Sequence, residues 1–129
     1  MNPRLVLASG KNLEPYLPKL KDALGGRAQI LDLGASIPDV PVAADTADHD
    51  HGHDGDCCAH GPNDPHWWHT PANMKRAARA LAAALTRMDP AHEQDYKAGL
   101  ARWNRKMDQL SSWARKELAD IPEADRILV

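Results

Sequence analysis

The sequence has no phenylalanine, only two cysteines and no long apolar run among its 129 residues. No stretch approaches the roughly 18 consecutive apolar residues of a membrane-spanning helix, and residues 1–10 are too weakly apolar for a signal peptide. The cysteines, Cys57 and Cys58, are adjacent, and neighbouring cysteines rarely bridge each other, so a disulfide scaffold is excluded. The net charge of −2 gives no indication of binding to nucleic acid or to an anionic membrane.

Residues 38–69 contain no lysine or arginine, yet they hold six of the seven histidines, both cysteines and seven aspartates. Asp, His, Gly and Pro do not build a packed core, so this segment is predicted to be a loop. Imidazole, thiolate and carboxylate groups are ligands of divalent metals. Residues 1–69 have 5 basic and 10 acidic groups (net −5), whereas residues 70–129 have 11 and 8 (net +3), which draws cations toward the loop.

Three histidines of the loop alternate with aspartate or glycine, so an extended backbone would place their rings on one side. We predict that the loop captures Zn²⁺ weakly and delivers it to a deeper site. The alternative is a solvated acidic linker with no binding role. The predicted capture ligands are His49, His51, His53 and His60.

The pattern of apolar residues predicts an α/β fold with a partial parallel sheet. Residues 4–8 and 28–33 are strand candidates, and apolar residues recur at helical spacing from Leu13 to Leu24. Gly25 and the glycine after it should stop that helix. Residues 1–36 are therefore predicted to form a βαβ unit, followed by the metal loop at residues 37–69.

Two helices are predicted after the loop. Thr70 and Pro71 predict a capping residue and a first-turn proline for a helix over residues 70–89. Asp89 and Pro90 repeat this pattern and predict the start of a long helix over residues 90–121. Its apolar stripe is Tyr96, Leu100, Trp103, Met107, Leu110, Ala114 and Leu118. Residues 122–129 look like the start of another strand, so the chain is expected to be an excerpt of a longer protein.

The string DPHWWHTP, residues 64–71, is the most specific one in the sequence. Its two prolines should stiffen the segment and present His66 in a fixed orientation. Trp67 and Trp68 are expected to bury around His66 and keep a metal site dry. The alternative is a hydrophobic staple at a helix start, with a surface histidine.

This string resembles the motif D-P-H-x-W-x-x-P of the zinc/manganese solute-binding proteins of bacterial metal ABC importers. Residues 5–20 are similar to a strand-and-helix stretch of that family's first lobe, with its small-Gly-x-x-Leu-Glu pattern at residues 8–14, and a His/Asp-rich insertion before the motif is typical of its zinc-specific members. The matching motif positions are Asp64, Pro65, His66, Trp68 and Pro71.

The resemblance implies that His66 is a metal ligand and that the remaining ligands lie before residue 1 and after residue 129. His69 stands where the family usually has an apolar residue. Residues 90–121 would connect two lobes, and residues 122–129 would enter the second. The whole protein would be a periplasmic or cell-surface receptor that gives Zn²⁺, favoured over Mn²⁺, to a membrane permease without catalysing a reaction.

Two other functions fit the residues alone. A small stand-alone zinc buffer or metallochaperone would use only the loop. A zinc hydrolase would use His66 and His69 as ligands, but no glutamate stands nearby as a general base. In each case imidazole must be neutral to bind metal, so affinity should fall below about pH 6. With an incomplete sheet, the chain is expected to have marginal stability.

Overall fold

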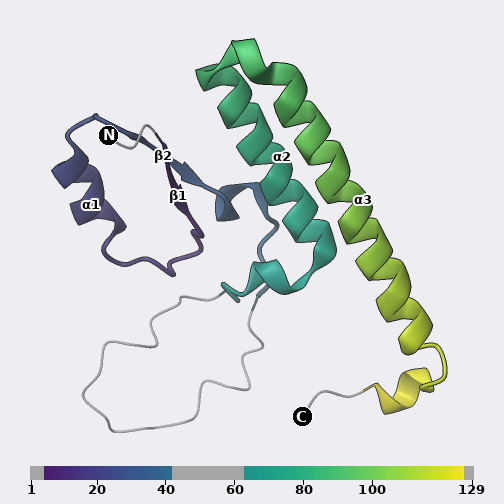
Figure 1. Cartoon of the computed structure of the whole chain (residues 1–129). Coiled ribbons are helices and arrows are strands. Elements are labelled where there is room, and N and C mark those ends of the chain that lie inside the picture. Colours follow the sequence, from purple (N-terminus) through teal and green to yellow (C-terminus); the bar gives the residue numbers. More distant parts are fainter. Residues whose placement is uncertain (1–4, 42–62, 127–129) are drawn as a thin grey trace, which may run out of the picture. The chain divides into compact units, whose positions relative to one another are not determined.

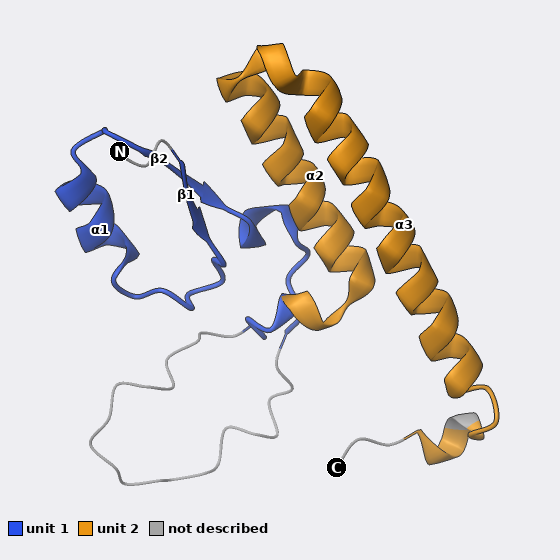
Figure 2. Cartoon of the chain, in the orientation of Figure 1, with its two compact units in different colours: residues 1–67 blue, residues 68–129 orange. Residues whose placement is uncertain are grey.

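The computed structural model describes residues 5–41 and 63–126. They belong to two compact units, residues 1–67 and residues 68–129 (Figure 2). Each unit has its own secondary structure, and the two are described separately below.

The first unit is built on two short parallel strands with a helix between them in sequence (Figure 1). Strand β1 (Leu5–Ala8) pairs with β2 (Gln29–Asp32), and Ala8 lies opposite Asp32. Parallel neighbours need a crossover connection, which contains helix α1 (Leu17–Leu24). A short 3₁₀ turn, η1 (Gly34–Ser36), follows β2.

Helix α1 begins later than the apolar spacing predicted, at Leu17 instead of Leu13. A helix that began at Leu13 would place Pro18 in its interior, where proline lacks the N–H for a bond to the Glu14 carbonyl and clashes with that carbonyl. In the observed helix Pro18 lies in the first turn, where no such bond is needed. The predicted end is correct, because Gly25 adopts the left-handed conformation with φ of 52°. Glycine does this without the steric penalty that a Cβ would bring.

The second unit consists of two helices that lie side by side (Figure 1). Helix α2 spans Pro71–Met88 and helix α3 spans Glu93–Glu117, with one 3₁₀ turn, η4 (Pro90–His92), between them. The predicted α/β class, a partial parallel sheet followed by two helices of which the second is long, is confirmed. Within residues 5–41 and 63–126, no helix has both the length and the apolar character needed to cross a membrane.

The predicted helix ends differ from the observed ones in detail. The Thr70 side chain makes no capping hydrogen bond, so the start of α2 depends on the preset φ of Pro71 rather than on a cap. Helix α3 is 25 residues long and ends at Glu117, not at Ile121. Residues 123–125 form a further 3₁₀ turn, η5, and the predicted strand residues 127–129 lie outside the described residues.

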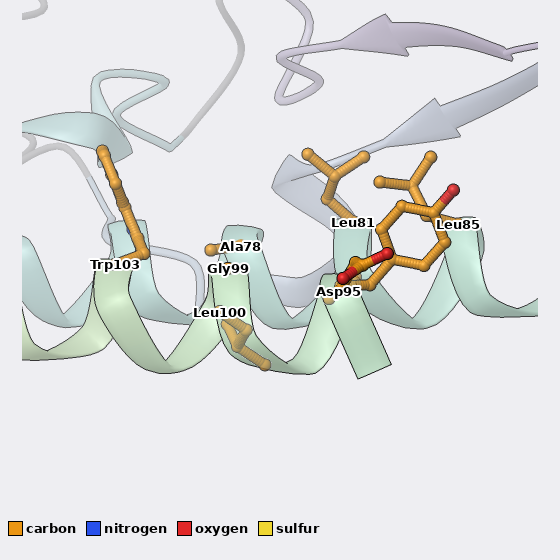
Figure 3. A pocket seen from close by; sticks show the side chains of 9 residues that line it. Ala78, Leu81, Leu85, Asp95, Gly99, Leu100 and Trp103 are labelled. Carbon is orange, nitrogen blue, oxygen red and sulfur yellow. The ribbon is translucent and has the colours of Figure 1, made fainter. Parts of the chain in front are cut away.

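Apolar side chains and two polar contacts join α2 to α3. The Trp103 indole donates to the Met74 carbonyl over 3.3 Å, and Lys75 Nζ lies 2.6 Å from an Asp108 carboxylate oxygen. Between the helices is an apolar groove of about 260 Å³ (Figure 3). Its lining includes Leu81, Leu85, Tyr96, Leu100 and Trp103.

The apolar stripe of α3 is not covered along its whole length. Leu110 and Leu118 are 43% and 46% exposed, and Trp113 is 59% exposed. Since α2 begins at Pro71 and Lys75 already pairs with Asp108, α2 offers little surface to the later turns of α3. The apolar stripe predicted from the spacing is therefore partly exposed toward the end of the helix.

The buried apolar core of the described residues is small. It comprises Ala8, Ile37 and Trp67 in the first unit, and Ala77 and Ala84 in the second. Because three of these five side chains are alanine, little apolar area is removed from water. The expectation of marginal stability agrees with such a core.

Candidate metal site

The carboxyl ends of β1 and β2 form the edge on which the DPHWW segment is held. The indole Nε1 of Trp67 donates a hydrogen bond of 3.0 Å to the carbonyl of Ser9, the residue directly after β1. Trp67 is only 8% exposed, so this bond is sheltered from water. In open parallel sheets, ligands usually bind beyond the carboxyl ends of the strands.

Two glycines allow the chain to close up at this edge. A Cβ added to Gly34 would lie 2.5 Å from the Ser9 carbonyl oxygen, the acceptor of the Trp67 bond. A Cβ on Gly10 would lie 1.9 Å from a carboxylate oxygen of Asp32. At Gly34 the obstacle is a backbone oxygen, so the close approach requires glycine, whereas at Gly10 the obstacle is the end of a side chain and the φ of 77° is what favours glycine.

His66 is oriented by a carboxylate two residues earlier. One Asp64 oxygen, Oδ1, accepts the backbone N–H of His66 at 2.9 Å and lies 2.7 Å from ring nitrogen Nδ1. The His66 side chain is 51% exposed and that of Asp64 is 49% exposed. A carboxylate on one ring nitrogen is the usual support for a histidine that binds metal through the other nitrogen.

The segment that carries His66 is also tied to the chain that precedes the loop. The Asp64 N–H donates to the Val40 carbonyl over 2.7 Å, and Pro41 pairs with Asn63 in an isolated antiparallel bridge. These contacts fix the backbone on both sides of residues 42–62. Asp64 therefore holds the His66 ring from a position that is itself anchored.

The expectation that both tryptophans bury around His66 is wrong for Trp68. Trp68 is 36% exposed, and its ring lies against His69, with centroids 5.5 Å apart and planes inclined by 41°. His69 is exposed. The 3₁₀ turn η3 (Trp67–His69) explains the difference, because consecutive residues of such a turn point in different directions.

The predicted loop ligands His49, His51, His53 and His60 lie outside the described residues, as do both cysteines. Within residues 5–41 and 63–126, no group of three or more His, Cys, Asp or Glu side chains could hold a metal ion. Zinc sites in proteins use three or four protein ligands. His66 would therefore need ligands from outside the described part of the chain.

The sequence pattern did not assign a role to Glu14. Its carboxylate accepts the backbone N–H groups of Ser9 and Gly10 at 2.7 and 3.0 Å, and it thereby closes the turn that also receives Trp67. The signal was the place of Glu14 as the last residue of the segment 8–14, which resembles the family's pattern. The resemblance gave this position no role of its own.

Comparison with known proteins identifies the class. The chain shares its fold with two crystal structures of ZnuA, one of them a deletion mutant with zinc bound, at TM-scores of 0.70 and 0.71 and identities of 25% and 26%. The matches cover 90% of this chain and 41% and 39% of those chains. The described residues thus have the α/β fold of a metal solute-binding protein.

The sequence agrees with this class. Residues 2–129 match the ZnuA family, described as the periplasmic component A of the zinc-uptake complex, and the chain belongs to that family. It is 28% identical over 126 residues to the metal-binding protein YtgA of Chlamydia trachomatis, covering 98% of this chain and 35% of YtgA. It is 25% identical to the manganese-binding lipoprotein MntA of Bacillus subtilis, covering 100% of this chain and 38% of MntA. The chain thus spans little more than a third of these relatives.

Proposed function

We propose that this chain is part of a periplasmic or cell-surface receptor that binds Zn²⁺ and passes it to the membrane permease of an ABC importer. It acts as a receptor and not as an enzyme. Membership of the ZnuA family supports the receptor class. The observation that carries the assignment to this site is the Asp64 carboxylate, which holds both the backbone and the ring of His66.

The chemistry of this pair favours zinc. With Nδ1 engaged by Asp64, coordination would use Nε2 of His66, and the carboxylate would stabilise the required tautomer and make the ring a better donor. Imidazole nitrogen suits Zn²⁺, whereas Mn²⁺ prefers oxygen ligands. The relatives include proteins named for zinc and for manganese, so we propose Zn²⁺ as the principal ion and Mn²⁺ as a weaker one.

The loop is proposed to be a capture segment. His49, His51, His53 and His60 would bind Zn²⁺ weakly and raise its concentration near His66. The net charge of −5 over residues 1–69 supports this role, because it attracts cations.

We propose that the helices connect this site to a second lobe. Residues 1–36 and 70–89 would belong to the first lobe, residues 90–121 would connect the lobes, and residues 122–129 would enter the second. Helix α3 has 25 residues, which corresponds to a length of about 37 Å at the rise of an α-helix. A single continuous helix of this length would limit hinge motion between the lobes.

Zinc titration by calorimetry tests the role of His66. His66→Ala should weaken the tightest site by more than about tenfold, the smallest loss usual for groups that only support a ligand. His92→Ala is a matched control, because His92 Nδ1 lies 2.8 Å from Asp89 in the same kind of exposed pair. The control should leave zinc affinity unchanged.

Deleting residues 46–61 separates the loop from the site. The deletion should lower the number of zinc ions bound per chain while the site that depends on His66 remains. If His66→Ala has no effect and the deletion abolishes all binding, His66 is not a ligand and the proposal fails. Mn²⁺ in the same titration should bind more weakly than Zn²⁺.

A further inference from the structure

The turn after β1 is held by one carboxylate. Glu14 Oε1 accepts the N–H of Ser9 at 2.7 Å, and Glu14 Oε2 accepts the N–H of Gly10 at 3.0 Å, both in a partly buried position. Hydrogen bonds to an ionised acceptor are roughly twice as strong as those between neutral groups. Glu14 therefore fixes two consecutive peptide groups with a single side chain.

The turn needs such a restraint because its backbone is unfavourable. Gly10, Lys11 and Asn12 have φ angles of 77°, 56° and 65° in succession. Residues other than glycine pay a free-energy cost in this region and stay there only when the surroundings impose it. The two hydrogen bonds to Glu14 hold the backbone in this conformation at Ser9 and Gly10, where the turn begins.

The peptide group between Ser9 and Gly10 joins Glu14 to Trp67. Its N–H is that of Gly10 and donates to Glu14, while its carbonyl oxygen is that of Ser9 and accepts the Trp67 indole N–H at 3.0 Å. Donation to a charged acceptor polarises a peptide group and makes its carbonyl a stronger acceptor. The Glu14 carboxylate thus strengthens the bond that holds Trp67.

A second connection leads from the same turn to Asp64. Lys11 Nζ donates to the Ile37 carbonyl over 2.7 Å and also pairs with the Asp39 carboxylate. These bonds fix the chain that leads to Val40, whose carbonyl accepts the Asp64 N–H. The turn therefore restrains the segment around His66 at Asp64 on one side and at Trp67 on the other.

From these contacts we infer that Glu14 is a positioning residue for metal binding at His66, acting through the Ser9–Gly10 peptide group and Trp67. The inference rests on the proposed function, since it takes His66 as the ligand. It adds a residue that lies outside the DPHWW motif and has no direct contact with the metal.

The test is a double-mutant cycle on the whole chain, with zinc affinity measured by calorimetry. Glu14→Gln keeps one acceptor oxygen but loses the charge and one of the two bonds. It should weaken zinc binding about tenfold, the lower end of the range for groups that support a metal ligand. Glu117→Gln, the same change at the exposed end of α3, is the control and should have no effect.

Trp67→Phe removes the indole donor and should weaken zinc binding by a similar factor. If Glu14 acts through Trp67, adding Glu14→Gln to Trp67→Phe should cause little further loss. Losses that simply multiply would show that Glu14 acts through general stability and would overturn the inference. Unchanged zinc affinity in Glu14→Gln would also overturn the inference. Should Glu14→Gln fail to fold, unchanged affinity in Trp67→Phe alone would refute the pathway.

A readout without metal separates this inference from the proposed function. The Trp67 indole N–H resonance, assigned by its absence in Trp67→Phe, should move upfield in Glu14→Gln because its hydrogen bond weakens. It should not move in Glu117→Gln. If His66→Ala leaves zinc binding intact, the proposed function fails, and this resonance still reports whether Glu14 acts on Trp67. A resonance that stays in place in Glu14→Gln refutes the connection itself.

Discussion

Gly34 offers the sharpest prediction about the edge of the sheet. Replacing it by alanine would place a Cβ 2.5 Å from the Ser9 carbonyl oxygen and 3.0 Å from a Lys11 side-chain carbon. The lysine carbon can move, but the carbonyl belongs to a peptide group held by Glu14 and Trp67. The backbone must therefore yield by roughly 0.9 Å to move from 2.5 Å to the 3.4 Å at which ordinary van der Waals contact begins.

The magnitude follows from two opposing effects. Forcing an extra carbon into a packed site costs about 1–3 kcal/mol, whereas alanine lowers the entropy of the unfolded chain and returns about 0.4–1 kcal/mol. The two ranges leave a net loss in the free energy of unfolding of about 0–2.6 kcal/mol. For Gly34→Ala we expect the larger values, about 1–2.6 kcal/mol, because the obstacle is a backbone carbonyl and not the end of a flexible side chain. The Trp67 indole resonance should also shift, because its acceptor oxygen is the atom that must move.

Urea unfolding followed by circular dichroism measures the change, and Gly99→Ala is the matched control. Gly99 lies inside α3, and a Cβ there would meet only the end of the Arg102 side chain at 3.8 Å. This variant should gain about 0.5–1 kcal/mol, since glycine weakens a helix interior. If Gly34→Ala is as stable as the unchanged chain, Gly34 does not lie as close to the Ser9 carbonyl as the structure places it.

Two further predictions concern the helical unit. The pKa of Tyr96 is raised above its ordinary value of 10.0, first because its hydroxyl donates to the Asp89 carboxylate, and further by partial burial and nearby negative charge. The neutral phenol is thus favoured in the folded state, and its contribution to stability is complete below pH 10 and is lost as pH rises through the raised pKa. Phenolate absorbance should show Tyr96 ionising at lower pH in Asp89→Asn, and an unchanged titration would contradict the assigned cause. The Lys75–Asp108 pair is exposed by 30% and 65%, so Asp108→Asn should cost less than about 1 kcal/mol. That cost should disappear in about 1 M salt, and a larger or salt-independent loss would show that the pair is not a surface ion pair.

Much of the fold could be predicted because its signals are local. The βαβ unit follows from two short apolar runs around a helical spacing, and Gly25 marks the end of α1 through its own backbone preference. The start of α1 could not be predicted in this way. It is set by Pro18, which a helix accepts in its first turn and not in its interior, and the spacing of apolar residues carries no information about that.

The candidate site was only partly predictable for a similar reason. His66 and Asp64 are two residues apart, so their pairing lies within the reach of a short motif. The hydrogen bond from Trp67 to Ser9 joins residues 58 positions apart. A local sequence pattern does not predict which distant carbonyl accepts the indole N–H. The burial of Trp67 likewise depends on its bond to Ser9, which lies far away in the sequence.

In the described part of the chain, two histidines pair with an aspartate in nearly equal geometry, and only one of them, His66, is a candidate metal ligand. His66 Nδ1 lies 2.7 Å from Asp64, and His92 Nδ1 lies 2.8 Å from Asp89. At the second pair the same Asp89 oxygen also accepts the Tyr96 hydroxyl at 3.0 Å. That carboxylate therefore stabilises the turn between α2 and α3. At the first pair the histidine precedes a tryptophan buried against the carboxyl ends of two parallel strands. A carboxylate beside an imidazole is therefore not a metal signal by itself; what distinguishes His66 is its place next to Trp67, which is buried and bonded to Ser9 directly after β1.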